Sequence, residues 1–183
     1  YAVGPDRDRG RLEKVVHERV EDPRAADCGR CTGIVERDDM LDVYEPTLKA
    51  LAKRGVPMIC ANPDLVVRNG DRIELCAGTL AAFYEEMRGT VLYHGKPFPD
   101  IYDHVFSLLG NPDPQRTLAI GDSLRTDMGG AQTIGVDALL IVDGIHSEEF
   151  GVSEGSEIDL EKVREGCNEE GIAPRAVMRR LVW

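Results

Sequence analysis

The chain has 183 residues, 42% of them hydrophobic, which is enough for one ordinary domain or two small ones with a buried core. Its 33 acidic and 22 basic side chains give a formal net charge of −11, which repels nucleic acid and anionic membranes, so neither is expected as a partner. No apolar run approaches the ~18 residues of a membrane span and the N-terminus shows no signal-peptide pattern, so the sequence predicts a cytoplasmic protein.

The first predicted helix lies in residues 41–54, followed by a strand over 57–60. Four apolar residues recur there at helical spacing: Leu41, Tyr44, Leu48 and Leu51. Pro46 is expected in the first turn, where proline is tolerated, and Gly55 is expected just after the helix.

A hairpin and a second helix are predicted next. Asn69-Gly70 readily takes the positive φ of a tight turn, so 65–68 and 72–76 are expected to pair as two short strands. Apolar residues over 80–87 then indicate an amphipathic helix that ends near Gly89.

The second half alternates strands with helices. Strands are predicted at 91–93, 117–120 and 138–142, with helices over 101–109 and 128–134 between them. Such alternation predicts an α/β fold in which helices cover a parallel sheet. The acidic stretch that follows, 147–157, is expected to be a solvated surface loop.

Two carboxylates stand where a ligand of such a sheet would bind. Gly121-Asp122 directly follows the predicted strand, which ends at Ile120, and Asp127 opens the next helix. Ligands bind beyond the carboxyl ends of parallel strands, and Mg²⁺ prefers oxygen ligands supplied by one or two carboxylates plus a substrate phosphate. The alternative is that Asp122 caps a turn and Asp127 stabilises a helix N-terminus.

Lys96 favours the metal interpretation. Gly95-Lys96-Pro97 follows the apolar strand 91–93, so its ammonium is expected at the same edge of the sheet as Asp122. Transfer of a phosphoryl group spreads negative charge over its oxygens, and a fixed lysine beside a divalent ion neutralises that charge.

These residues resemble motifs III and IV of the haloacid dehalogenase (HAD) superfamily: Gly95-Lys96-Pro97, then Gly-Asp-Ser-Leu-Arg-Thr-Asp over 121–127. The segments 60–64 and 76–78 and the helix running into 135–137 resemble class IIA of that superfamily. The resemblance implies that residues 1–89 form an α/β cap domain. Residues 90–183 would then form the C-terminal half of a Rossmann-like parallel-sheet core.

The resemblance also implies an activity and roles. The family member would be a Mg²⁺-dependent phosphatase acting on a small phosphorylated metabolite, such as a sugar or nucleotide phosphate. Asp122 would bind the metal, Asp127 would hold the metal or its waters, and Lys96 would stabilise the nucleophile and phosphoryl oxygens. Asn62 and Asp64 would face the substrate from the cap. Caps of this class often pair, so a homodimer is expected by analogy.

The family nucleophile, an Asp in a strand-terminal Asp-x-Asp, is not found in this chain, nor is the Ser or Thr of motif II. Asp6-Arg7-Asp8 does not fit, because it follows Gly4-Pro5 rather than an apolar strand and lacks the family's Gly-Thr turn. We therefore expect an upstream portion to be missing and this chain to be inactive alone. The alternative is a non-catalytic ligand- or partner-binding module made of the cap and half of the core.

The five cysteines are expected to be reduced thiols rather than a disulfide framework, since their number is odd and three of them lie in or beside apolar strands. Cys28 and Cys31 have the spacing of redox and zinc sites, but no second ligand pair matches them. A structural role is the favoured interpretation and a redox or metal role the alternative. Gly29-Arg30 fits poorly to the buried strand that the class IIA resemblance places here.

Overall fold

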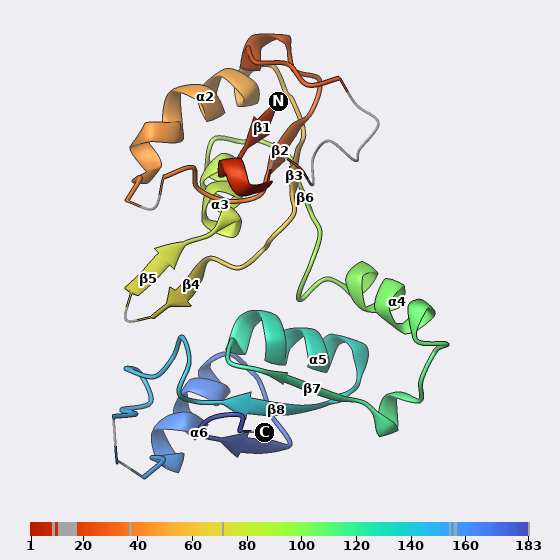
Figure 1. Cartoon of the computed structure of the whole chain (residues 1–183), viewed down its shortest axis with the longest axis vertical. Coiled ribbons are helices and arrows are strands. Elements are labelled where there is room, and N and C mark those ends of the chain that lie inside the picture. Colours follow the sequence, from red (N-terminus) through yellow and green to blue (C-terminus); the bar gives the residue numbers. More distant parts are fainter. Residues whose placement is uncertain are drawn as a thin grey trace. The chain divides into compact units, whose positions relative to one another are not determined.

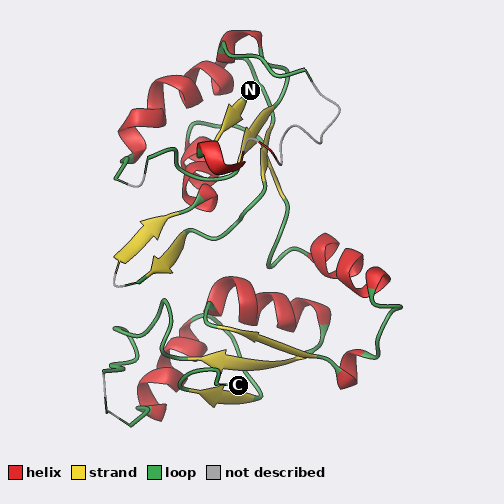
Figure 2. Cartoon of the chain, in the orientation of Figure 1, coloured by secondary structure: helices red, strands yellow, loops and turns green. Residues whose placement is uncertain are grey.

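The computed structural model describes residues 1–8, 10, 18–36, 38–70, 72–153, 155 and 157–182. The fold is α/β, as predicted, and divides into unit 1 (Tyr1–Gly95) and unit 2 (Lys96–Trp183), each with its own parallel sheet and hydrophobic core (Figures 1 and 2). No described helix is long and apolar enough to cross a bilayer. The assignment of 1–89 to a cap and of 90–183 to a core half stays a prediction.

Unit 1 is built on a four-stranded parallel sheet in the order β1-β2-β3-β6. The strands are β1 (Ala2–Val3), β2 (Gly29–Cys31), β3 (Met58–Cys60) and β6 (Val91–Tyr93). In β2 and β3 fully buried residues alternate with partly exposed ones, so one face of the sheet is the more deeply buried.

Helices α2 (Leu41–Lys53) and α3 (Ala77–Glu86) pack against each other in unit 1. The predicted spacing in α2 is confirmed, because its buried residues are Tyr44, Leu48 and Leu51. Gly55 follows with φ +68°, the left-handed conformation that favours glycine after a helix. The predicted first-turn position of Pro46 is wrong: the helix begins at Leu41, so this proline lies inside it and offers no N–H to the preceding turn.

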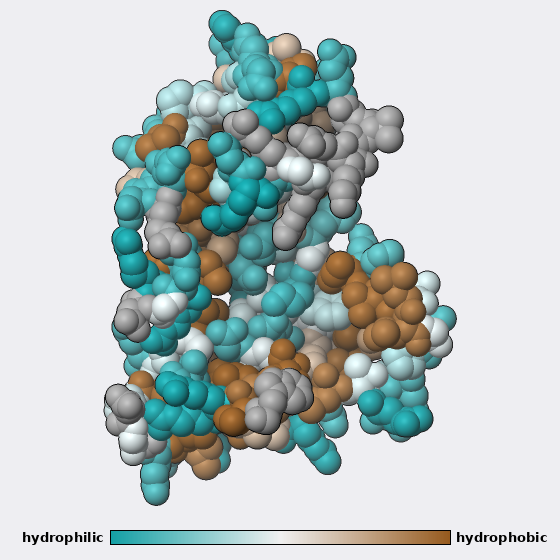
Figure 3. Space-filling view, in the orientation of Figure 1, coloured by the Kyte–Doolittle hydropathy of each residue, from teal (hydrophilic) through white to brown (hydrophobic). Residues whose placement is uncertain are grey.

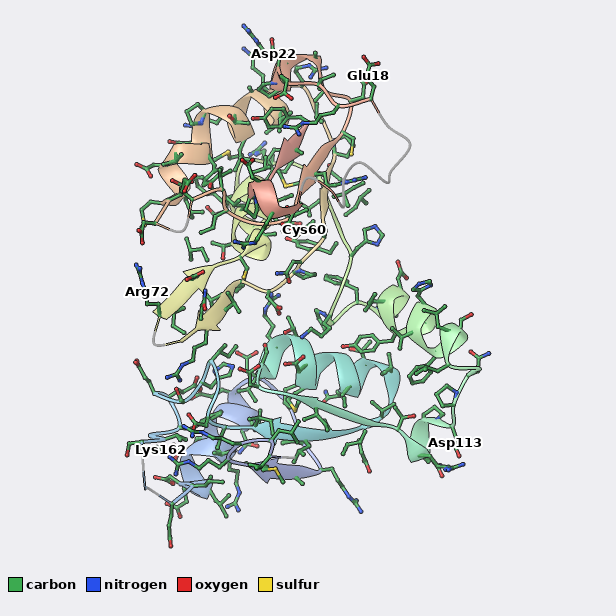
Figure 4. The ribbon with its side chains drawn as sticks, in the orientation of Figure 1. Glu18, Asp22, Cys60, Arg72, Asp113 and Lys162 are labelled. Carbon is green, nitrogen blue, oxygen red and sulfur yellow. The ribbon has the colours of Figure 1, made fainter. Side chains whose placement is uncertain are left out.

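The predicted hairpin is confirmed as β4 (Val66–Asn69) and β5 (Arg72–Leu75), an antiparallel pair with Gly70 at φ +64°. Arg72 projects from the hairpin surface and forms an ion pair with Asp38 at 2.6 Å, whereas Cys60, at the end of β3, has no exposed surface (Figure 4). The hairpin forms a sheet of its own.

Strand β6 does not belong to the sheet for which it was predicted. We expected 91–93 to join the parallel sheet of the second half, but Val91–Tyr93 pairs with Met58–Cys60 of unit 1. Val91 and Tyr93 pack against the unit 1 core, which explains the pairing. A three-residue apolar strand has the same sequence pattern in either sheet, so periodicity could not decide between them.

Unit 2 contains a three-stranded parallel sheet in the order β7-β8-β9, formed by β7 (Leu118–Gly121), β8 (Asp137–Ile141) and β9 (Ala176–Met178). Its helices are α4 (Pro99–Leu108), α5 (Gly129–Ile134) and α6 (Leu160–Glu169). The fully buried part of its core includes Leu124, Leu140, Val142 and Phe150. Short 3₁₀ turns complete the chain at Asp6–Asp8, Pro23–Ala25 and Pro114–Arg116.

Helix α4 is exposed although its sequence is amphipathic. None of its residues is fully buried, and apolar side chains gather over it in Figure 3. Leu108 is 72% exposed and Leu109 is 67% exposed, while in β7 Leu118 and Ile120 are 50% and 42% exposed. Unit 2 therefore leaves part of its apolar surface uncovered on these two elements.

Candidate functional site

The candidate site lies at the carboxyl ends of β7 and β8 in unit 2. The two strands are parallel neighbours, so the segments that follow them, Asp122–Leu124 and Asp143–His146, begin at the same edge of the sheet. Lys96, the first residue of unit 2, reaches the same place through its side chain.

Asp127 connects Lys96 to the turn after β7. Its Oδ1 accepts from the Nζ of Lys96 at 2.5 Å, and its Oδ2 accepts from the backbone N–H groups of Asp122 and Ser123, both at 3.1 Å. The Asp127 side chain is 12% exposed and that of Lys96 44% exposed. The carboxylate thus holds an ammonium on one oxygen and a backbone turn on the other.

Asp122 is held differently. Its Oδ2 accepts from the backbone N–H of Ile145 at 3.0 Å, and among the described residues none donates to its Oδ1. Two glycines make room for the carboxylates: a Cβ at Gly144 would lie 2.2 Å from Asp122 Oδ2, and one at Gly121 would lie 2.2 Å from Asp127 Oδ2. The Ile145 N–H therefore orients the Asp122 carboxylate through Oδ2, and Oδ1 is left open to a ligand.

A π-helical turn, Leu124–Met128, explains how Asp127 returns to the strand end. The Oγ of Ser123 accepts from the N–H of Thr126 at 3.2 Å, and the carbonyl of Ser123 accepts from Asp127 and from Met128. Turns of this wide kind are rare and occur frequently at functional sites. Here the turn brings the Asp127 carboxylate beside the amides that precede it.

The donor set fits a hard cation through Asp122. Mg²⁺ prefers oxygen ligands and keeps several waters, so one open carboxylate oxygen can serve as a protein ligand. Both oxygens of Asp127 already accept hydrogen bonds, so it is better suited to orient Lys96 or a metal-bound water than to bind a cation directly. Within the described ranges no three His, Cys, Asp or Glu side chains gather as a metal site. The metal roles of Asp122 and Asp127 stay predictions.

The segment after β8 was missed by the sequence reasoning. We expected 147–157 to be solvated, but Ser147 is 5% exposed and Phe150 is fully buried, so this prediction is wrong for the first part of the stretch. Asp143-Gly144-Ile145-His146, directly after the apolar strand at 138–142, is the signal that could have identified it. Because β7 and β8 are parallel neighbours, the segments that follow them lie at the same edge of the sheet, so each segment is a candidate part of the site.

Asp143, also at this edge, is engaged by arginines that follow β9. Its Oδ2 accepts from Arg180 Nε at 2.5 Å and lies 3.7 Å from Arg179 Nε. The Asp143 side chain is 12% exposed. Because its charge is compensated by two guanidinium groups, Asp143 ties the ends of β8 and β9 together rather than offering a free carboxylate.

Asn62 and Asp64 belong to unit 1, where they line a cavity of about 200 Å³ with Arg7, Glu74 and Cys76. Burial, then the nearby carboxylates of Asp64 and Glu74, raises the pKa of the Cys76 thiol to about 11, which keeps it protonated at neutral pH. Asn62 Oδ1 accepts from the N–H of Asp64 at 3.3 Å, and this bond shapes the segment after β3. The substrate-binding role of both residues stays a prediction.

Asp6 and Asp8 also lie in unit 1, in a 3₁₀ turn. One reason for rejecting them as the nucleophile is wrong, since β1 (Ala2–Val3) does precede Gly4-Pro5. The following Gly-Thr turn of the family is still absent, because Arg7-Asp8-Arg9 continues the sequence.

All five cysteines are free thiols. Gly29–Cys31 forms strand β2 in spite of its unusual sequence, because buried Gly29 fits against Leu51 of α2 and the backbone of Pro57. Cys31 is fully buried beside Cys60 of the neighbouring strand, and burial raises its pKa to about 12. A redox Cys-x-x-Cys motif opens a helix and exposes a thiolate, so this arrangement favours the structural role.

Comparison with known proteins places this arrangement in a family. A model of the HAD-hydrolase-like family matches residues 93–160, which include Lys96, Asp122 and Asp127. A hydrolase of the haloacid dehalogenase-like family from Brucella suis is 34% identical, with a TM-score of 0.79, over 100% of this chain and 65% of its own. The chain belongs to the haloacid dehalogenase-like family.

Two more distant structures share the fold of this haloacid dehalogenase-like chain. The p-nitrophenyl phosphatase from Archaeoglobus fulgidus is 21% identical, with a TM-score of 0.59, over 86% of this chain and 55% of its own. The 4-nitrophenylphosphatase from Thermotoga maritima is 19% identical, with a TM-score of 0.67, over 98% of this chain and 61% of its own. This chain thus spans less than two thirds of the length of these relatives. No curated protein matches it.

Proposed function

We propose that this chain is part of a Mg²⁺-dependent phosphoric monoester hydrolase of HAD class IIA. Its substrate would be a small phosphorylated metabolite such as a sugar or nucleotide phosphate. The observation that carries the proposal is the arrangement of Lys96, Asp127 and Asp122: an ammonium held at 2.5 Å by one carboxylate, beside a second carboxylate with an open oxygen. The similarity of its fold to two nitrophenyl phosphatases supports it.

Each residue has a physical task in this proposal. Lys96, oriented by Asp127, offers its ammonium to the oxygens on which negative charge accumulates during phosphoryl transfer. Asp122 would hold the magnesium ion through Oδ1 while Ile145 fixes Oδ2. When bound, the metal would neutralise charge on the phosphate oxygens. Pairing of two copies, by analogy with the class, and a cytoplasmic location, as expected from the sequence, are also part of the proposal.

None of the unit 2 residues described at this site is assigned the role of the nucleophile. The family resemblance implies an Asp-x-Asp at a strand end that precedes the cap, so catalysis would require a segment upstream of Tyr1. The apolar surface left open on α4 and β7 agrees with this requirement, because a further strand and helix packed there would cover it.

The test is hydrolysis of p-nitrophenyl phosphate by two proteins side by side, the 183-residue chain and a longer natural chain with an upstream Asp-x-Asp. We expect Mg²⁺-dependent turnover from the longer protein and none above buffer from the 183-residue chain. If the longer protein has a folded core and no activity with any phosphate ester, the non-catalytic binding module becomes the better description.

A further inference from the structure

The turn Gly144–Phe150, which follows β8, is held by its own hydrogen bonds, by the unit 2 core and by α6. Within it the Ser147 N–H donates to the Gly144 carbonyl and the Phe150 N–H to the His146 carbonyl. Phe150 is fully buried in the unit 2 core. On α6, a Cβ at Gly166 would lie 2.8 Å from Glu149 Oε1 and 3.0 Å from Phe150, so the turn fits closely against that helix.

His146 connects this turn to the one after β7. Its Nε2 accepts from the backbone N–H of Leu124 at 3.3 Å, and its Nδ1 lies 2.7 Å from Glu149 Oε2. For Nε2 to accept this N–H it must carry no proton, and the ring proton on Nδ1 then donates to Glu149. The ring also packs on Phe150, with centroids 5.6 Å apart. One side chain thereby fixes both turns.

The two turns that His146 joins are those that orient Asp122. Leu124 is two residues beyond Asp122, and Ile145, whose N–H donates to Asp122 Oδ2 at 3.0 Å, is the residue before His146. The Leu124 residue is only 1% exposed, so loss of its acceptor would leave a buried N–H unsatisfied. Nothing in the proposed chemistry of Lys96, Asp122 and Asp127 uses His146 itself.

We propose that His146, held by Glu149, is a positioning residue that keeps Asp122 directed toward a bound metal ion. Its hydrogen bond to Leu124 clamps the turn after β8 against the turn after β7, so that the Ile145 N–H stays on Asp122 Oδ2 and leaves Oδ1 open. The metal part of this inference rests on the proposed function; the clamp itself does not. Residues that orient a metal ligand through such contacts typically change metal affinity by about 10- to 100-fold when removed.

The experiment is an NMR titration of the 183-residue chain with Mg²⁺, combined with amide hydrogen exchange. In His146→Ala we expect the Mg²⁺ Kd to rise by about tenfold or more and the Ile145 amide to exchange faster than in the wild type. In His146→Gln, whose amide oxygen can replace Nε2 as the acceptor, both quantities should return toward wild-type values. His104→Ala, which alters an exposed histidine of α4, is the matched control and should change neither.

The outcomes separate this inference from the proposed function. If the wild type binds no Mg²⁺, the metal role of Asp122 is refuted. Exchange of the Ile145 amide then tests whether His146 holds the two turns together: faster exchange in His146→Ala supports this role, and unchanged exchange overturns it. Unchanged Mg²⁺ affinity and exchange in a folded His146→Ala would overturn the inference while leaving the proposed function intact. If His146→Ala does not fold, ¹⁵N spectra of the wild-type ring decide it, and a proton found on Nε2 would overturn it.

Discussion

The two units differ in how completely their helices are buried. In unit 1, α2 and α3 both place residues with no exposed surface into the core, among them Leu48, Leu51 and Tyr84. In unit 2, α4 has no fully buried residue, and β7 exposes Leu118 and Ile120. Unit 1 also exposes apolar side chains, such as Ile73 of β5 at 55% and Leu92 of β6 at 50%, but both of its helices are anchored in its own core. The contrast therefore lies in α4, an amphipathic helix without a buried residue, which a further element could cover.

The most direct test of this contrast compares two leucines. Leu48→Ala should lower the free energy of unfolding by about 2–5 kcal/mol, because Leu48 is fully buried and its loss leaves a cavity. Leu108→Ala, on the exposed face of α4, should change it by less than about 0.5 kcal/mol. Urea unfolding measures both. A large cost for Leu108→Ala would mean that α4 is covered in solution, for example by a second copy.

Phosphatase activity gives the second test of the contrast between the units, because the proposed site lies in unit 2. In a longer protein that hydrolyses p-nitrophenyl phosphate, Asp122→Asn should reduce turnover by about a hundredfold or more, the scale of losing a major electrostatic stabiliser. Thermal unfolding should stay close to that of the wild type, since Asp122 is partly exposed and its single hydrogen bond can be kept by an amide oxygen. Activity that survives this substitution would show that the site is elsewhere.

Local sequence patterns predicted individual helices and turns better than they predicted which strands pair. Helix spacing in α2 and the Asn69-Gly70 turn depend on neighbours in sequence, so both were predicted correctly. The partner of β6 depends on which core its apolar residues enter, information that a three-residue strand does not carry. Pro46 inside α2 was misplaced because the burial of Tyr44 and Leu48 outweighs the missing hydrogen bond.

For the site, spacing was sufficient to single out Lys96, Asp122 and Asp127, and the structure brings Lys96 to Asp127 and Asp127 to the turn at Asp122. Lys96 was expected at this edge because the strand before it was assigned to the same sheet, but that strand belongs to unit 1. His146 was not singled out, because its function depends on a contact with Leu124 that no sequence motif encodes. A contact between two turns that are far apart in the sequence can be predicted only when the fold is known.

The buried thiols of unit 1 predict a pH effect. Burial raises the pKa of Cys31 from 9.0 to about 12, so above pH 9 the unfolded chain loses this proton while the folded chain keeps it, and stability falls as pH rises toward 12. At pH 10 this thiol alone should cost about 1.4 kcal/mol relative to pH 8. Urea unfolding at both pH values should show a smaller decrease for Cys31→Ala than for the wild type, and an equal decrease would contradict the burial.

The smallest expected effect concerns the ion pair of the candidate site. Lys96→Met should change the free energy of unfolding by less than about 1 kcal/mol, because Lys96 is 44% exposed and water screens much of its attraction to Asp127. Asp127→Ala should cost more, since it removes the acceptor of two backbone N–H groups, each of which costs about 1–3 kcal/mol when left unsatisfied in a buried position.

Both variants should abolish most phosphatase activity in a longer protein, so stability and activity should separate in Lys96→Met and fall together in Asp127→Ala. Chemical unfolding of the two variants beside the wild type measures the difference. Equal losses of stability would show that the ion pair, rather than the backbone hydrogen bonds, holds the turn after β7. In that case the lysine would be part of the framework of unit 2 as well as of its proposed chemistry.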